Sequence, residues 1–506
     1  MFVRKKTNPS GSTSIQIIDK SAGKYRVIKT VGVSSDVLEI AFLWKKAHHI
    51  IPTLIGQSSF DFMSETDRSI VHALSNDTTA KVQVNGPEKI LGVIFNNIGF
   101  DKIEDALFKH LVLARLVCPM SKLATTDYLH RYSGLNMDVS KVYRFMDKLK
   151  RDYKEKAERI VYLHTQKILR NKVGIVFYDM TTLYFEIEYE DDFRKLGFSK
   201  DGRPQNPQIL LGLLVGENGY PIGYELFEGN KFEGDTLIPV LERFQKKYNL
   251  PKPIVIADAG LLSKENLKHL SENGYEYIMG ARIKNESDAM KNKIIELDLS
   301  DGRLKQIRKE DGSRLIVGYA DKRARKDAFN RQRGLQRLEK KLKTGKLTKS
   351  HINNKGYNKY LKLTGEINLE IDYEKFHQDA RWDGLKGYLT NSKLKAEKVV
   401  ENYNQLWHIE KAFRVSKSDL KVRPVFHRLQ RRIESHICIS FCAYTLYKEL
   451  ERILSINKAA ISPHRAIELI QTMYTLTITL PESQQTYTIE LPMDEQQQKL
   501  CRWVST

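Results

Sequence analysis

Two aspartates in this chain each stand directly after a short apolar stretch. Asp179 follows residues 173–178, and Asp258 follows residues 253–257. A carboxylate at the end of a buried strand is costly unless it meets a cation or hydrogen-bond donors. Either aspartate alone is more typical of a helix cap or a turn residue, but two such placements together favour a shared site.

A third carboxylate, Glu410, lies in a segment of helical periodicity at residues 401–420. Tyr403, Glu410 and Lys417 are seven residues apart, which places them within about 40° of one another around a helix. An adjoining apolar stripe would dock this helix on a sheet and turn Glu410 toward the two aspartates. The stripe consists of Leu406, Ile409, Phe413 and Leu420. A merely solvated helix edge is the alternative interpretation.

The three carboxylates together predict a metal site. Oxygen ligands of this kind suit Mg²⁺ or Mn²⁺ and disfavour zinc. Two ions held about 3.5–4 Å apart can activate an attacking oxygen and stabilise a departing one during displacement at a phosphodiester. We therefore expect Asp179, Asp258 and Glu410 to be both the catalytic residues and the ligands of two ions.

The elements that must position these side chains form an α/β pattern. Three predicted strands are followed by a helix, a fourth strand and a second helix, at residues 173–178, 208–215, 222–227, 236–248, 253–257 and 264–273. This order is that of an RNase H-like mixed sheet flanked by helices. The first and fourth strands of such a sheet are neighbours, so Asp179 and Asp258 would converge.

The regions on either side of these elements differ from them in predicted secondary structure and in charge. Residues 15–31 predict a hairpin and residues 36–51 a helix, whereas residues 103–117, 122–132 and 139–149 have the rhythm of a helix-turn-helix-like DNA-binding unit. Any small helical bundle gives the same rhythm. Between residues 322 and 349 there are twelve Lys or Arg and two acidic residues. That segment is either a solvated helix or a surface that follows phosphates.

These patterns divide the chain into six predicted regions. They are residues 1–100, an N-terminal hairpin with helices; 101–171, the helical DNA-binding region; 172–281, the first part of the core; 282–375, an inserted charged domain; 376–455, the second part of the core; and 456–506, a C-terminal helix and hairpin.

Composition points to a polyanionic partner. The chain has 83 Lys and Arg against 62 Asp and Glu, a formal net charge of +21, and such an excess favours nucleic acid through counterion release. No apolar run approaches the roughly 20 residues of a membrane-spanning helix, and the N-terminus lacks the apolar stretch of a secretory signal. The four cysteines are not spaced as metal ligands and predict core thiols in a reducing cytoplasm.

At the three carboxylates the sequence resembles insertion-sequence transposases of the DDE type. Residues 177–185 and 256–260 look like the two aspartate motifs of these enzymes. The third motif resembles the branch with a Tyr-x2-Arg-x3-Glu-x6-Lys signature, whose spacing holds at Tyr403, Glu410 and Lys417. Leu406 occupies the arginine position, and Arg414, one turn after Glu410, is a candidate for the missing cation. The similarity covers roughly residues 100 to 450.

This resemblance implies an RNase H-like core with an insertion between the second aspartate and the glutamate. It further implies binding to the terminal inverted repeats of a mobile element, metal-dependent cleavage, and attack of the freed 3′-hydroxyl on target DNA. Tyr403, Arg414 and Lys417 would contact DNA. The expected partners are double-stranded DNA and a second copy of the chain in a synaptic complex, in a prokaryotic cytoplasm at the nucleoid.

Two other functions are compatible with the same residues. The chain could be a DNA-binding protein that descends from such an enzyme and has lost catalysis, although the intact trio argues against this. It could also be an RNase H-like nuclease that hydrolyses DNA without joining it. The signature around Glu410, rather than the carboxylates themselves, disfavours the nuclease.

Overall fold

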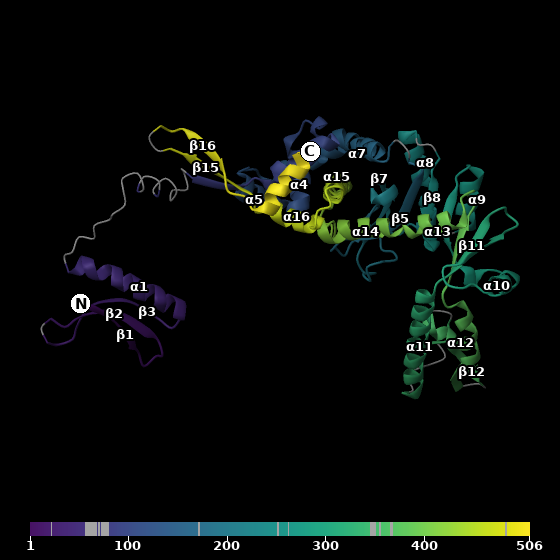
Figure 1. Cartoon of the computed structure of the whole chain (residues 1–506), viewed down its shortest axis with the longest axis horizontal. Helices are drawn as coiled ribbons and strands as arrows, with labels where there is room; N and C mark the ends of the chain where they lie inside the picture. Colours follow the sequence, from purple (N-terminus) through teal and green to yellow (C-terminus); the bar gives the residue numbers. More distant parts are fainter. Residues whose placement is uncertain are drawn as a thin grey trace. The chain divides into compact units, whose positions relative to one another are not determined.

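The computed structural model comprises two compact units. One contains residues 1–81 with 477–488, and the other contains residues 82–476 with 489–506. Figure 1 labels their elements. The residues described are 1–21, 23–55, 68, 71, 80–170, 173–249, 252–261, 263–344, 351–353, 356–364, 368–480 and 483–505.

The smaller unit contains a three-stranded antiparallel sheet and one helix. β1 (Phe2–Thr7), β2 (Thr13–Asp19) and β3 (Arg26–Ser34) pair in sequence order, and α1 (Val37–Leu54) packs against them. The buried side chains of Ile15 and Ile17 meet Ala47 of α1. The predicted hairpin and helix are confirmed, with β1 as an additional strand; Ala22, in the predicted turn, lies outside the described residues.

The larger unit is built on an eight-stranded mixed sheet with the order β10-β11-β14-β9-β8-β5-β6-β7. β5 pairs antiparallel with β6 and parallel with β8, which in turn is parallel to β9. The first and fourth predicted strands are therefore neighbours, as expected. The strand bounds are β5 Ile175–Tyr184, β6 Gln208–Val215, β7 Pro221–Glu228, β8 Ile254–Ala257, β9 Tyr277–Ala281, β10 Leu304–Arg308, β11 Arg314–Tyr319 and β14 Leu385–Thr390.

Helices cover both faces of this sheet because successive side chains of a strand alternate between faces. Tyr178 of β5 belongs to the cluster that includes residues of α8 (Leu237–Tyr248) and α9 (Lys264–Glu272). Phe177 belongs to the cluster on the opposite face, which includes residues of α13 (Ala396–Asn404) and α14 (Trp407–Arg414). Asp179 is two residues after Phe177 and so lies on the face of α13 and α14.

The first predicted strand was too short. β5 does not end at Tyr178 but continues through Asp179 to Tyr184, in register with β6. The polar side chains of Thr181 and Thr182 are only 4% and 1% exposed. β-branched threonines fit a pleated, buried surface, so the end of the apolar run was not the end of the strand, and Asp179 lies within it.

The single helix predicted at residues 401–420 is also wrong. α13 ends at Asn404, α14 begins at Trp407, and a π-helical turn follows at Val415–Asp419. Between the helices, the amides of His408 and Ile409 bond to carbonyls three residues earlier rather than four. This tighter turn changes the rotation per residue, so the 100° rule does not place Tyr403, Glu410 and Lys417 on one face.

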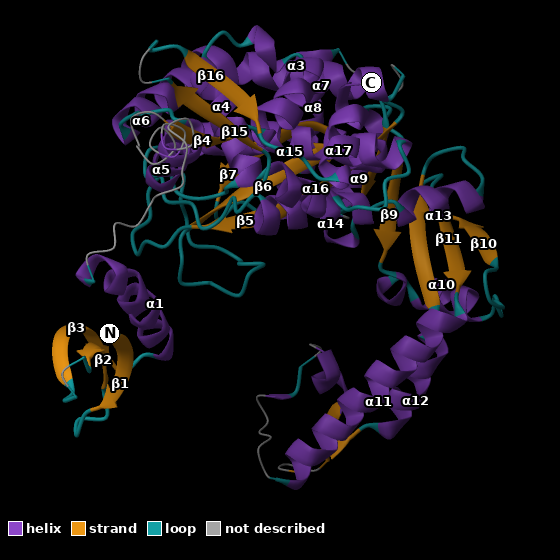
Figure 2. Cartoon of the chain, turned by 60° about the vertical axis from the view of Figure 1, so that its left-hand side comes forward, coloured by secondary structure: helices purple, strands orange, loops and turns teal. Residues whose placement is uncertain are grey.

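The region predicted as an insertion, residues 282–375, divides in two. β10 and β11 extend the large sheet through β14. The remainder has a small core of its own, with α11 (Asp321–Lys343) and α12 (Tyr373–Asp379) beside the hairpin of β12 (Leu361–Thr364) and β13 (Asn368–Ile371) (Figures 1 and 2). Residues 345–350 of the predicted basic segment lie outside the described residues.

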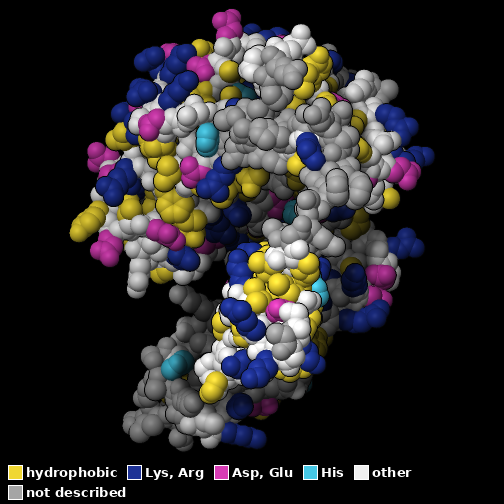
Figure 3. All heavy atoms as spheres, turned by 90° about the vertical axis from the view of Figure 1, so that its left-hand side faces the viewer, with side chains coloured by type: hydrophobic (Ala, Val, Ile, Leu, Met, Phe, Trp, Pro, Cys, Tyr) yellow, Lys and Arg dark blue, Asp and Glu magenta, His cyan; other side chains and the backbone are white. Residues whose placement is uncertain are grey.

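The helices predicted at residues 103–117, 122–132 and 139–149 are present as α4 (Ala106–Val117), α5 (Lys122–Ser133) and α6 (Val139–Lys148), and α7 (Lys154–Ile168) follows them. None of the described helices combines the length and apolar character needed to cross a bilayer. Lys and Arg side chains are spread over the face shown in Figure 3.

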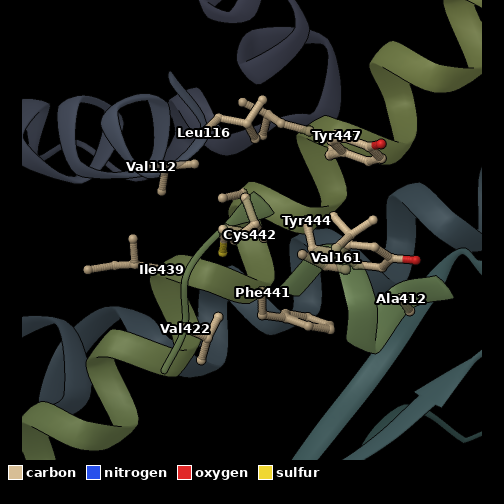
Figure 4. Close-up of a cluster of buried hydrophobic side chains, with 14 of the residues drawn as sticks. Val112, Leu116, Val161, Ala412, Val422, Ile439, Phe441, Cys442, Tyr444 and Tyr447 are labelled. Atoms are coloured by element: carbon tan, nitrogen blue, oxygen red, sulfur yellow. The ribbon is translucent and has the colours of Figure 1, made fainter. Parts of the chain in front are cut away.

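The long helix α15 (Gln430–Ile456) packs against α4, α6 and α7. Figure 4 shows Val112 and Leu116 of α4 and Ala412 of α14 around the side chains of α15. Cys438 and Cys442 of α15 are fully buried as thiols, as predicted, whereas Cys118 and Cys501 are half-buried. This shared core joins the helical region to the helix that carries Glu410.

Candidate active site

The structure brings Asp179 and Asp258 together. Tyr178 of β5 stands opposite Ala257, the last residue of β8, in the parallel register, and an aspartate follows each of them in the chain. Each carboxylate also accepts a hydrogen bond from the following backbone amide, at 2.7 Å from Met180 N to Asp179 Oδ1 and 2.7 Å from Ala259 N to Asp258 Oδ1. The two acidic side chains are thus held at adjacent positions of one sheet.

The charge of Asp179 is poorly neutralised. The pKa of this carboxyl is raised to about 6, chiefly by burial and to a smaller extent by the negative charges of Glu233 and Asp258. Lys200 opposes the shift, with its Nζ 3.9 Å from Asp179 Oδ1. Because Lys200 also pairs with Glu233 at 2.8 Å, its single charge is shared between two acids.

Tyr403 connects α13 to this acidic pair. Its hydroxyl donates a hydrogen bond to Asp258 Oδ1 at 3.1 Å, and Lys386 Nζ lies 4.6 Å from the centre of its ring. Burial and the charge of Asp258 raise the pKa of Tyr403, so it stays a hydrogen-bond donor at neutral pH. Gly280 leaves the necessary room, since a Cβ there would lie 2.4 Å from the Tyr403 hydroxyl.

Glu410 is close to the pair but does not join it. It is exposed on α14, which packs against β5. Burial lowers the pKa of Lys386, whereas the charges of both Asp258 and Glu410 act to raise it. Both acids are therefore near the same lysine. Within the described ranges, no three Asp, Glu, His or Cys side chains are grouped closely enough to hold a metal ion.

The chemistry of the donors nevertheless fits a hard divalent cation. The side chains near Asp179 supply carboxylate oxygens, which Mg²⁺ and Mn²⁺ prefer. The raised pKa of Asp179 shows that its ionised form is destabilised by burial and by like charges, and a bound cation reverses both effects. Asp179 and Asp258 are the residues that would hold such an ion. Glu410, the third ligand predicted from the sequence, lies near them.

Lys417 lies in a separate ion-pair cluster. Its Nζ is 3.4 Å from Asp201 Oδ1, and Arg423 binds the other oxygen of the same carboxylate. Thr182 of β5 also contacts Asp201, at 3.4 Å. The side chain of Lys417 is only 14% exposed, and its pKa is lowered, chiefly by burial and against the pull of Asp201. This lysine is already paired with an acid of its own chain.

The remaining signature positions differ in exposure. Leu406 is 8% exposed and belongs to the main core, together with Ile409, Phe413 and Leu420. The apolar stripe of the sequence therefore does dock this segment, as predicted. Leu406 has neither the charge nor the exposure for a phosphate contact, whereas Arg414 is exposed in the last turn of α14.

Several polar residues near the site were not identified from the sequence. Lys200 and Asp201 lie between β5 and β6, and Glu233 lies in a short 3-10 turn before α8. Lys386, in β14, comes from a strand far along the chain. Single charged residues in loops, or in a strand distant along the chain, have no periodicity that marks them as part of a site, and their charge was the only available signal.

A basic cavity of about 500 Å³ lies beside Lys386. Two of its cations, Arg323 and Arg331, come from the predicted basic segment, and Arg331 pairs with Asp383 at 2.5 Å. Its charged lining residues are Arg282, Lys284, Arg323, Arg331, Lys359 and Lys386, against Asp327 and Asp383. One end of α11 thus contributes positive charge next to the candidate site.

One of three comparisons with known proteins identifies the family of this chain. A solved structure of a piggyBac transposase synaptic complex with hairpin DNA is similar over 76% of this chain and 76% of that chain, at 11% identity and a TM-score of 0.38. No curated protein matches. The family model described as "Transposase DDE domain" matches residues 191–446, which include Asp258 and Glu410 and begin after Asp179. Since this match spans half of the chain, the protein belongs to the family of DDE transposases.

Proposed function

We propose that this protein is the transposase of an insertion sequence, which binds the terminal inverted repeats of its element, cleaves them and joins the freed ends to target DNA. The observation that carries this proposal is the pairing of Asp179 and Asp258 on parallel neighbouring strands, with too little positive charge to neutralise them. Membership of the DDE transposase family supports the reaction class.

In this proposal Asp179, Asp258 and Glu410 hold two Mg²⁺ or Mn²⁺ ions. The ions supply activation of the attacking oxygen and stabilisation of the departing one. Tyr403 orients Asp258 through its hydrogen bond, and burial of Asp179 keeps that ligand in a region of low polarity. Glu410 completes the set when its exposed side chain turns toward Asp258.

The proposed DNA contacts are Tyr403, Arg414 and Lys417, which place the chain in the Tyr-Arg-Glu-Lys branch with one altered position. Because Leu406 is buried, Arg414 takes over the cationic role in this proposal. Lys417 contacts a phosphate by exchanging its partner Asp201, which keeps Arg423. The net charge of +21 supports a polyanionic partner.

The wider arrangement is proposed on the same basis. Residues 101–171 bind the element ends, and the charged region within 282–375 adds phosphate contacts around an RNase H-like core. Two copies of the chain hold two ends in a synaptic complex, at the nucleoid of a prokaryotic cell. Support for the core comes from the order of β5 to β9, in which the first and fourth strands are parallel neighbours.

A strand-transfer assay tests the proposal. Purified protein is incubated with duplexes that carry the DNA flanking its gene, a supercoiled target plasmid and Mg²⁺. We expect cleaved ends joined to the plasmid, and no products when the metal is chelated or the end sequence is shuffled. Cleavage without joining would instead identify a hydrolytic nuclease, and binding without cleavage an inactive DNA-binding protein.

A further inference from the structure

A second group of ionisable side chains lies outside the carboxylate site, where α4, the start of α5 and α15 meet the segment after Lys417, and three of its members, Arg115, Lys122 and His436, are buried. All of its members are cationic side chains or imidazoles, and they line a cavity of about 180 Å³. They are Arg115, Lys122, Lys421, Arg423, His427 and His436. No Asp or Glu is among the described residues that line this cavity.

The two most deeply buried cations have weak partners. Arg115 and Lys122 are each 5% exposed. Arg115 Nη1 donates to the carbonyl oxygen of Leu420 at 3.5 Å, and Lys122 Nζ lies 3.5 Å from Nδ1 of His436. Over the described ranges, no carboxylate forms an ion pair with either side chain. Buried charges without a counter-charge are costly, and natural proteins rarely keep them.

The pKa shifts of the basic groups around the cavity indicate that no negative charge compensates them. Burial lowers the pKa of Arg115 to about 10 and lowers the pKa of Lys122, on which the charge of Arg115 acts in the same direction. Burial and the same two cations lower the pKa of His427 to about 3 and also lower that of His436. Both imidazoles are therefore neutral at pH 7, and an anion in the cavity would favour every cation that faces it.

The start of α5 adds to this environment. α5 is a helix of 12 residues, and Ser121, its N-cap, lines the cavity together with Lys122 of the first turn. Backbone amides at a helix N-terminus carry partial positive charge and are common contacts for phosphate. The cavity therefore combines a helix N-terminus with buried cations that lack acidic partners.

We propose that this cavity binds a phosphate group, held mainly by Arg115 and Lys122. A phosphate offers several acceptor oxygens, which match the fork of an arginine and the ammonium of a lysine. Arg423 links this site to Lys417, because both bind Asp201. Neither the carboxylate trio nor the proposed contacts of Tyr403, Arg414 and Lys417 use this cavity.

The phosphate can come from a DNA backbone or from free inorganic phosphate. The rim favours DNA, since Phe426 is 66% exposed and Met120 is 43% exposed among the residues that line the cavity, and exposed aromatic rings beside phosphate sites stack on bases. Only the DNA source rests on the proposed function; phosphate binding as such does not.

Calorimetric titration and thermal unfolding of the full chain test the site, with inorganic phosphate as the probe and NaCl of equal ionic strength as the reference. We expect saturable phosphate binding and a rise in melting temperature that chloride does not give. Lys122→Met and Arg115→Met should each weaken phosphate affinity roughly 10- to 100-fold, the effect of losing one hydrogen bond to a charged group. Lys264→Met, at an exposed lysine of α9 outside the proposed DNA-binding regions, is the matched control and should bind as the wild type does.

Absence of phosphate-specific binding to the wild-type chain would overturn the proposal, even if neither variant folds. So would equal phosphate affinity in all three folded variants. A short duplex of arbitrary sequence then identifies the source. Weaker duplex binding by Lys122→Met, with competition by inorganic phosphate, assigns the site to DNA; unchanged duplex binding with weaker phosphate binding assigns it to the free anion. Failure of the cleavage reaction alone would reject the transposase proposal and leave these titrations unaffected.

Discussion

The acidic pair at β5 and the end of β8 and the cationic cavity between α4, α5 and α15 each gather charges of one sign. They differ in accessibility. Asp258 is exposed and the side chain of Asp179 is 27% exposed, whereas Arg115 and Lys122 are each 5% exposed. The acidic pair lies where a cation and a large substrate can both reach it, whereas the two buried cations line a cavity of about 180 Å³, the size of one small group.

Asp201, in the same part of the chain, is an acid whose charge is balanced by basic side chains. Two cations, Lys417 and Arg423, bind its two oxygens. Asp179, by contrast, shares one lysine with Glu233. The number of charged side chains is therefore a poor guide to a binding site, and the shortage of opposite charge around them is a better one.

The largest effect should come from neutralising the acidic pair and its proposed partner. Asp179→Asn, Asp258→Asn and Glu410→Gln should each reduce cleavage of end DNA by roughly 10³-fold or more, because each removes a metal-ligand charge without changing the shape of the side chain. Binding to the same DNA should stay largely intact. Cleavage is measured by gel electrophoresis of labelled ends and binding by a mobility-shift titration.

Glu272→Gln is a suitable control, since Glu272 is an exposed acid at the end of α9. It should cleave at the wild-type rate. If one of the three variants keeps wild-type cleavage, that residue does not belong to the site. The acidic site would then consist of the remaining acids alone.

The second largest effect should be that of salt on DNA binding. It tests whether Lys and Arg side chains contact DNA phosphates. Affinity for duplex DNA should fall on the order of 10³-fold between about 50 and 200 mM salt if roughly six phosphates are neutralised. Fluorescence anisotropy with a labelled duplex measures the slope. Binding that does not change over this range would contradict a phosphate-contacting surface and the reasoning from net charge.

Asp179→Asn should also stabilise the protein by about 1–3 kcal/mol above pH 6. The pKa of Asp179 is raised from 3.8 to about 6, so the folded state binds more protons than the unfolded state between these values. The stability of the wild type therefore falls as pH rises from about 4 to about 6, whereas asparagine has no such dependence. Urea unfolding of both proteins at several pH values measures the difference.

The two proteins should have similar free energies of unfolding near pH 4, and Mg²⁺ should narrow their difference at neutral pH by stabilising only the wild type. Destabilisation by Asp179→Asn at neutral pH would mean that the carboxylate is satisfied within the fold, as Asp201 is.

The smallest expected effect comes from removing Lys417, one of the two cations that bind Asp201. Lys417→Ala should destabilise the fold by about 1–2 kcal/mol, because Asp201 loses one of its two cations in a partly buried place. If Lys417 also contacts DNA, affinity for cleaved ends should fall as well. A double-mutant cycle with Asp201→Asn separates the roles: the stability cost should shrink in the double mutant, and the DNA defect should persist. Unchanged stability and unchanged affinity in Lys417→Ala would show that its pair with Asp201 contributes little and that Lys417 does not contact DNA.

The sequence by itself determined most of the elements around the acidic pair, although it predicted β5 too short. Apolar runs and their periodicity predicted β6, β8 and α8 nearly as the structure has them, since such patterns record which faces are buried. The strand order then predicted that Asp179 and Asp258 would be neighbours. The apolar stripe from Leu406 to Leu420 likewise marked the segment that docks on the core.

Only the tertiary structure decided how the charges are paired. The tight turn between α13 and α14 placed Tyr403 and Glu410 on two different helices, and Asp201 from a loop became the partner of Lys417. The cationic cavity joins side chains more than 300 positions apart, such as Lys122 and His436. Local patterns report burial along one element, whereas the free energy of a buried charge depends on every element around it, so the packing of distant segments fixes which charges remain without a partner.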